Sequence, residues 1–164
     1  MFSCFLDVIP TAKGRARFTR KGFAYTPEKT RAAENSMRNI LSKAYKGIPL
    51  DVPLIMYAFF LVPKPKSVKR EFPSVKPDLD NYIKALSDSA NGIVWKDDSQ
   101  VIQIHTAKLY GDTPGIVFGV DLFVTEDLHG LMPLLDHLAA HEGQGLGSAP
   151  SEGAFPAPGS DRTQ

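Results

Sequence analysis

The sequence predicts an α/β fold: a mixed β-sheet of about four or five strands flanked by helices. Three patterns support it. The run 52–62 is continuously apolar and rich in aromatic residues, which is typical of a buried central strand. Two further strand patterns follow at 101–110 and 115–124, and helical patterns lie at 27–46 and 78–91. A chain of 164 residues, 43% of them hydrophobic, is long enough to bury one core, so one domain is expected.

The chain opens with a loosely alternating segment, 2–9, which predicts a first strand. Residues 10–25 form a basic arm in which cationic and aromatic side chains alternate, and Lys21-Gly22 predicts the turn of a hairpin. Guanidinium groups suit phosphates and aromatic rings can stack on bases, so the arm is a candidate DNA-binding element. The alternative is a solvated hairpin that packs on the domain. The candidate DNA contacts are Lys13, Arg15, Arg17 and Arg20.

A helix is expected from Thr26-Pro27-Glu28, with Thr26 as N-cap and Pro27 at the first helical position, and Gly47 ends it. Its basic residues are interpreted as a solvated face. Those residues are Arg31, Arg38, Lys43 and Lys46.

The stretch 76–98 is the most informative part of the chain. Pro77 favours a helix that starts just after it, with Leu79, Tyr82 and Ile83 on an apolar face. Gly92 is expected to end this helix. Asp97 and Asp98 follow at the opening of the next strand, so we expect this short acidic loop to fold back towards the acidic start of the helix.

Three gathered carboxylates repel one another, and a divalent cation would relieve the repulsion. Oxygen-only ligands suit Mg²⁺ or Mn²⁺. Lys84, one turn after Asp80, could orient a carboxylate or stabilise charge on a phosphate. Bland alternatives stay open: Asp78 as an N-cap, Asp80 and Asp88 as surface partners of Lys84, and 97–98 as an ordinary turn.

Charge is unevenly distributed, although the net charge is only +1. Residues 1–50 hold ten Lys/Arg against three Asp/Glu, whereas residues 77–164 hold four against thirteen. A basic front half and an acidic site suit a phosphate polymer that is held by one part and cut by another. The basic loop 63–76 leads directly into the acidic stretch.

The single cysteine, Cys4, excludes an internal disulfide and fits a reducing cytoplasm. No apolar run reaches membrane-spanning length, and the N-terminus lacks a signal-peptide pattern, so no membrane partner is expected.

The domain is expected to span 1–126. A short amphipathic C-terminal helix is predicted over 127–141, and the Gly-, Ser-, Pro- and Ala-rich residues 142–164 predict a disordered tail.

Two motifs resemble the signature of the RusA family of Holliday junction resolvases: Lys-Pro-Asp-Leu-Asp-Asn-x-x-Lys at 76–84 and Asn-Gly-x-x-x-x-Asp-Asp-Ser-Gln-Val at 91–101. The resemblance runs from about Pro10 to Val124, and the arm also resembles the N-terminal basic region of the family. It implies a RusA-like fold and a small, dimeric, Mg²⁺-dependent endonuclease, bacterial or carried by phages. By position, Asp78, Asp80 and Asp98 match the metal-binding acids, and Lys84 matches the catalytic lysine.

The sequence thus predicts a structure-selective endonuclease that resolves Holliday junctions, four-way DNA branches, by paired symmetric nicks during DNA recombination and repair. Its catalytic residues would be Asp78, Asp80, Lys84 and Asp98. Two-fold symmetry of the junction favours a homodimer, because one chain shows one acidic cluster and two matched nicks are needed. The alternatives are a non-catalytic DNA-binding module and, in a different enzyme class, a nucleotide-sugar transferase that uses its Asp-x-Asp.

Overall fold

The structure, a computed structural model, describes residues 1–14, 17–18, 24–25 and 27–124. Met1–Val124 forms one compact unit. The predicted domain end at residue 126, the helix 127–141 and the tail 142–164 lie outside the described residues, so they stay predictions.

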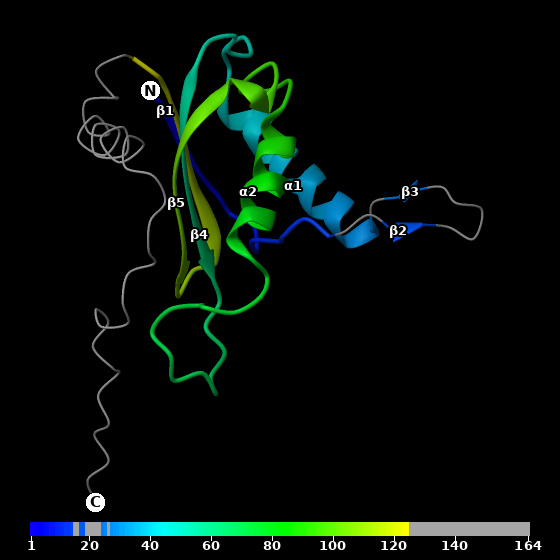
Figure 1. The fold of residues 1–164 in the computed structure, drawn as a ribbon, viewed down its shortest axis with the longest axis vertical. Helices are drawn as coiled ribbons and strands as arrows, with labels where there is room; N and C mark the ends of the chain where they lie inside the picture. The colour runs from blue at the N-terminus through cyan, green and yellow to red at the C-terminus, as the bar shows by residue number, and fades with distance from the viewer. Residues whose placement is uncertain (15–16, 19–23, 26, 125–164) are drawn as a thin grey trace, which may run out of the picture. The chain divides into compact units, whose positions relative to one another are not determined.

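One four-stranded mixed sheet forms the centre of the fold, as predicted (Figure 1). The strand order is β1-β6-β4-β5. The central strand β4 pairs antiparallel with β6 on one side and parallel with β5 on the other. The strands are β1 (Phe2–Leu6), β4 (Leu54–Val62), β5 (Val101–Tyr110) and β6 (Gly115–Leu122). The position of β4 confirms the interpretation of its apolar run as a buried central strand.

The predicted hairpin in the basic arm is also present. Strands β2 (Arg17–Phe18) and β3 (Ala24–Tyr25) pair antiparallel, with Arg17 opposite Tyr25. The turn between them lies outside the described residues.

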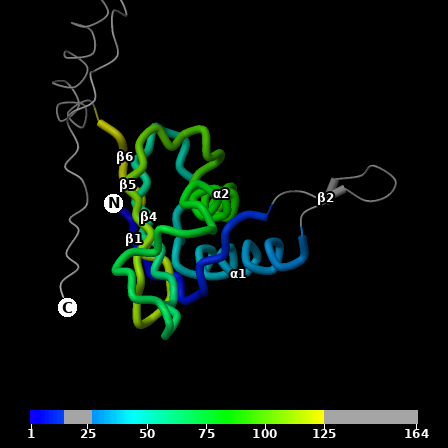
Figure 2. Tube along the Cα trace, turned by 60° about the horizontal axis from the view of Figure 1, so that its bottom comes forward, coloured from blue at the N-terminus to red at the C-terminus, as the bar shows by residue number. Residues whose placement is uncertain are grey.

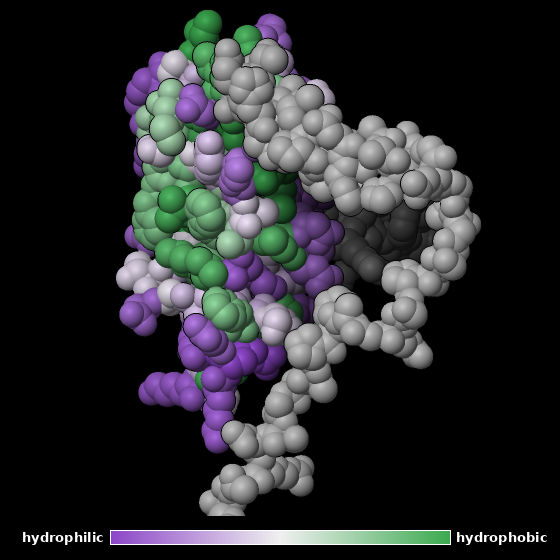
Figure 3. All heavy atoms as spheres, turned by 60° about the vertical axis from the view of Figure 1, so that its left-hand side comes forward, coloured by the Kyte–Doolittle hydropathy of each residue, from purple (hydrophilic) through white to green (hydrophobic). Residues whose placement is uncertain are grey.

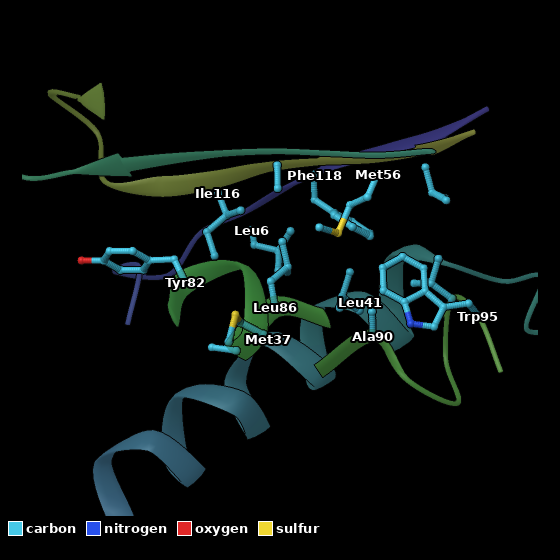
Figure 4. Close-up of a cluster of buried hydrophobic side chains, with 14 of the residues drawn as sticks. Leu6, Met37, Leu41, Met56, Tyr82, Leu86, Ala90, Trp95, Ile116 and Phe118 are labelled. Carbon is cyan, nitrogen blue, oxygen red and sulfur yellow. The ribbon is translucent and has the colours of Figure 1, made fainter. Parts of the chain in front are cut away.

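Two helices, α1 (Glu28–Ala44) and α2 (Leu79–Ala90), lie on the same side of the sheet (Figures 1 and 2). The core fills the space between them and the sheet (Figure 4). Alternate residues of β4, among them Met56 and Phe60, point into this core and meet Leu86 of α2 and Leu41 of α1. The buried residues, which alternate along the strands and form apolar stripes on the helices, therefore make up a single core layer.

Trp95 belongs to this core. Its side chain is fully buried, its ring packs edge-on against Phe118, and its Nε1 donates to Asn91 Oδ1 at 2.7 Å. Cys4 is half-buried against the same core, and burial raises the pKa of its thiol, which fits a small packed side chain.

The opposite face of the sheet has no helix of the described residues over it. Figure 3 looks onto this side, where hydrophobic side chains gather along the strands. Phe5 and Val117 are each more than 40% exposed there.

The order β4–α2–β5 positions the functional residues. Because β4 and β5 run parallel, α2 must return the chain from the end of β4 to the beginning of β5. The helix therefore begins beside the loop 63–78 and ends beside the loop 91–97, at opposite ends of the sheet (Figure 1). Twelve helical residues span about 18 Å.

Candidate functional site

The start of α2 presents two acidic side chains. Asp78 occupies the N-cap position, yet its side chain makes no capping hydrogen bond. Asp80 lies in the first turn, where Asn81 Nδ2 donates to its Oδ1 at 3.2 Å. Both carboxylates are exposed, and neither forms an ion pair with another described residue. The N-cap alternative is right about the position of Asp78 but not about its hydrogen bond, so its oxygens stay available to a ligand.

Lys84 lies one turn further along α2 and is exposed. Within the described residues it forms no ion pair, so the alternative in which Asp80 and Asp88 are its surface partners is not what the structure has. Its ammonium is available on the helix surface that follows the two carboxylates.

Asp98 does not join this group. It opens the short helix η1 (Asp98–Gln100), which follows the C-terminal end of α2 and leads into β5. The expectation that this loop folds back towards the start of the helix is wrong, because α2 separates the two acidic segments by its whole length. Across the part of the chain that the structure describes, no three acidic, histidine or cysteine side chains lie close enough to hold a metal ion.

The loop that carries Asp98 is held in place by its neighbours. Asp97 accepts from Ser99 N at 3.0 Å, and Gln100 Oε1 accepts from the backbone N–H groups of Lys96 and Asp97 at 3.1 Å. Gln100 Nε2 in turn donates to Asp51, which pairs with Lys96. Hydrogen bonds from the side chain and backbone of Ser99 lower the pKa of Asp97. Asp97 thus caps the turn, while Asp98 beside it takes no part in the cap.

Lys13, a predicted phosphate contact, is paired with acids of both helices. Its ammonium pairs with Glu34 of α1 at 3.2 Å and with Asp88 of α2. Partial burial lowers the pKa of Lys13, but the hydrogen bonds that its ammonium donates to Asp88 and Glu34 outweigh this effect, so the pKa lies above its ordinary value. The side chain therefore ties this part of the chain to both helices, and its role as a phosphate contact stays a prediction.

The backbone of Lys13 also contacts α2. Its N–H donates to Asn81 O at 2.9 Å, so the first part of the arm lies against the first turn of α2. Arg17 is in β2, and Arg15 and Arg20 lie outside the described residues. The arm thus departs from a point beside the two carboxylates, and the DNA-binding assignment of its arginines stays a prediction.

Arg38 was expected on a solvated face, and that interpretation is wrong. Its Nη1 donates to Ser89 O at 3.2 Å and to Asn91 O at 3.0 Å. A cation on the last carbonyls of a helix satisfies acceptors that have no partner within the helix. Arg38 therefore closes the C-terminal end of α2.

The sequence interpretation missed Lys108. Its Nζ donates to Val75 O at 2.6 Å and to Pro77 O at 2.7 Å, and it lies 5.9 Å from the centre of the Tyr82 ring. It fixes the backbone that leads into the carboxylates, while burial raises the pKa of Tyr82 beside it. In β5, Lys108 pairs with Phe60 of β4, whose side chain is buried under the helices. Paired residues point to the same face of a sheet, so the alternation along the strands places Lys108 on the helix side.

The loop between β4 and α2 is rich in lysine and arginine. Five of its cationic side chains are exposed, and Glu71 is the only acid among residues 63–76. Hydrophilic side chains dominate this lower end of the molecule in Figure 3. The cationic residues are Lys64, Lys66, Lys69, Arg70 and Lys76.

The donor set at the start of α2 fits a hard divalent cation. Two exposed carboxylates offer only oxygen, and Mg²⁺ is commonly bound through one or two carboxylates together with substrate phosphate. The adjacent lysines and arginines suit a polyanion. A metal ion and a nucleic-acid phosphate at this end of α2 stay predictions at this point.

Comparison with known proteins decides the family. The family model described as Endodeoxyribonuclease RusA matches residues 7–120. The chain belongs to the RusA family. This family comprises endodeoxyribonucleases, so the resemblance in the two motifs is confirmed over most of the described chain.

A relative in Bacillus subtilis (strain 168), named "Uncharacterized protein YqaN", is 31% identical over 122 residues. The match covers 65% of this chain and 86% of the relative. Among the described residues, no helix of this RusA family member is long and apolar enough to cross a membrane.

Proposed function

We propose that the protein is a Mg²⁺-dependent, structure-selective endonuclease that resolves Holliday junctions by paired symmetric nicks. The observation that carries the proposal is the pair of exposed carboxylates, Asp78 and Asp80, at the start of α2 within the motif of an endodeoxyribonuclease family. The two carboxylates repel each other and would repel an approaching DNA phosphate. A cation shared with a DNA phosphate relieves that repulsion.

Asp78 and Asp80 hold the metal from one chain. Bound Mg²⁺ would neutralise charge on the scissile phosphate and activate the attacking water, and Mn²⁺ also suits the same oxygen ligands. Lys84, one turn along the helix, offsets the charge that develops on the phosphate during attack. The arginines of the arm and the cations of the loop 63–77 hold the DNA backbone on either side.

Asp98 belongs to a complete site only if a second chain supplies it. The helix α2, about 18 Å long, lies between Asp98 and the two carboxylates of its own chain. In an isologous homodimer every contact between the protomers occurs twice. If the segment with Asp98 of one protomer contacts the start of α2 in its partner, the partner's segment makes the same contact in return. Two equivalent sites then result, one for each nick of a two-fold symmetric junction.

Cleavage of defined DNA structures tests the proposal. The purified protein is incubated with labelled four-way junction, flap and plain duplex, with Mg²⁺ and with EDTA. We expect symmetric nicks in the four-way junction, dependence on Mg²⁺, and little cleavage of duplex. Binding of junctions without any cleavage in Mg²⁺ or Mn²⁺ would instead identify a non-catalytic DNA-binding module.

A further inference from the structure

A pocket of about 580 Å³ lies directly beside Asp78. Its walls come from the last part of the loop between β4 and α2, the start of α2 and the edge strand β5. It is open to solvent and falls within the size range of small-molecule sites. The lining residues are Phe72, Pro73, Ser74, Val75, Lys76, Asp78, Leu79 and Lys108.

Hydrogen bonds give the wall of this pocket a defined shape. Ser74 N donates to Phe72 O at 2.9 Å and Val75 N donates to Pro73 O at 2.8 Å, which makes two successive tight turns. Pro73 is buried, and Lys108 binds the carbonyls of Val75 and Pro77 from the sheet. The loop therefore presents this wall in one conformation before any ligand arrives.

Two apolar side chains of the wall are left in solvent. Phe72 is 58% exposed and Val75 is 46% exposed. A phosphate would need only the cations of the loop. A nucleobase, in contrast, is flat, has an aromatic face, and gains from stacking on an exposed aromatic ring.

We propose that this pocket receives an unstacked nucleobase, next to the phosphate that lies at Asp78 and Asp80, with Phe72 as its stacking surface and Lys76 facing the neighbouring phosphate. The inference rests on the proposed function and adds a source of substrate selectivity. A branched junction supplies bases that have already lost a stacking partner, whereas a plain duplex must first be unstacked at a cost. The pocket thus favours the branch point over duplex.

Fluorescence of 2-aminopurine, placed in turn at each nucleotide adjoining the exchange point of a four-way junction, tests this directly. The full-length protein is used in Ca²⁺, so that binding is read without cleavage. We expect wild type to change the fluorescence at one or more of these positions. Phe72→Ala should abolish that change and weaken junction binding by about tenfold or more, while Phe72→Trp retains both.

A matched control is Ile48→Ala, which removes an 85% exposed apolar side chain in the loop after α1. It should leave fluorescence and affinity unchanged, and Phe72→Ala should leave affinity for plain duplex unchanged. No fluorescence change with wild type, or an unaltered change with Phe72→Ala, overturns the pocket.

The two proposals fail separately. Junction cleavage by Phe72→Ala at the wild-type rate, with the fluorescence change intact, overturns the pocket and leaves the nuclease standing. A Phe72-dependent fluorescence change in a protein that never cuts junctions in Mg²⁺ supports the pocket and overturns the nuclease.

Discussion

The two ends of α2 differ in whether their polar groups have partners within the protein. At the C-terminal end Arg38 binds the last carbonyls, Trp95 binds the side chain of Asn91, and Gly92 N donates to Trp95 O at 2.8 Å. At the N-terminal end Asp78 stands in the cap position without a capping hydrogen bond, and Asp80 is exposed beside it.

This difference separates stability from function within one helix. Polar groups that are satisfied inside the protein hold the fold together, whereas exposed acids without ionic partners contribute little to stability and leave their oxygens available to a ligand. Substitutions at the C-terminal end, the closed end, should therefore alter the free energy of unfolding and leave catalysis intact. Substitutions at the N-terminal end, the open end, should lower catalysis and leave the free energy of unfolding nearly unchanged.

The largest expected effect is on cleavage, and it tests whether Asp80 of one protomer and Asp98 of the other form one metal site. Asp80→Asn and Asp98→Asn should each lower junction cleavage by at least about a hundredfold while junction binding persists, because the amide removes a charge that faces Mg²⁺. In mixed dimers of the two variants one site has neither substitution, so nicking of a single strand should return. The measurement is a denaturing gel of the junction strands after co-expression.

Asp112→Asn is the matched control, because it removes an exposed acid in the turn between β5 and β6. It should cleave like wild type. Mixed dimers as inactive as either parent would contradict a site shared between protomers, and near wild-type cleavage by Asp80→Asn alone would show that the carboxylates are structural.

Lys84→Met should lower turnover roughly a hundredfold, because the lysine offsets charge in the transition state. Junction affinity in Ca²⁺ should change little, and so should the Mg²⁺ concentration at half-maximal rate, since Lys84 is not a ligand. Single-turnover kinetics check this against Lys43→Met, an exposed lysine in the last turn of α1. A raised Mg²⁺ requirement with unchanged maximal rate would assign Lys84 to carboxylate orientation instead.

Arg38→Met addresses the closed end. It leaves the carbonyls of Ser89 and Asn91 without their charged donor, so the free energy of unfolding should fall by about 2 kcal/mol. Urea denaturation measures this. Arg31→Met, on the exposed face of the same helix, should stay within about 0.5 kcal/mol of wild type. A cleavage rate per folded molecule that falls with Arg38→Met would show that the two ends are coupled.

The smallest expected effect is that of Lys13, which ties both helices together. Because its pKa is raised in the folded state, its contribution is fully present below its unfolded value near 10.5 and is lost as the pH rises through the folded value. Lys13→Met should therefore cost about 1 kcal/mol at pH 7, and the difference from wild type should shrink above pH 10.5. A difference that persists unchanged to higher pH would point to lost packing alone.

Lys13→Met also sharpens the assignment of the arm. Since its ammonium faces Glu34 and Asp88, the salt dependence of junction binding should stay near that of wild type. Loss of one phosphate contact would instead reduce the log–log slope by about 0.9.

Local sequence determined the elements and the chemistry of this protein. The apolar run of β4, the alternation in β6 and the helix that ends before Gly92, whose φ is 72°, all follow from patterns within one segment. The motif around Asp78 and Asp80 also lies within a few residues, so its composition and its position at a helix start were predictable.

Only the tertiary structure decided which of these residues meet. A helix between two parallel strands must carry the chain the length of the sheet, so Asp98 lies far from Asp80 although their two motifs are only a few residues apart in the sequence. Long-range ion pairs and hydrogen bonds join side chains to groups that are distant in the sequence, as for Lys13, Arg38 and Lys108. Periodicity encodes which face of an element is buried, but long-range pairing depends on how the elements cross, and no local pattern specifies that.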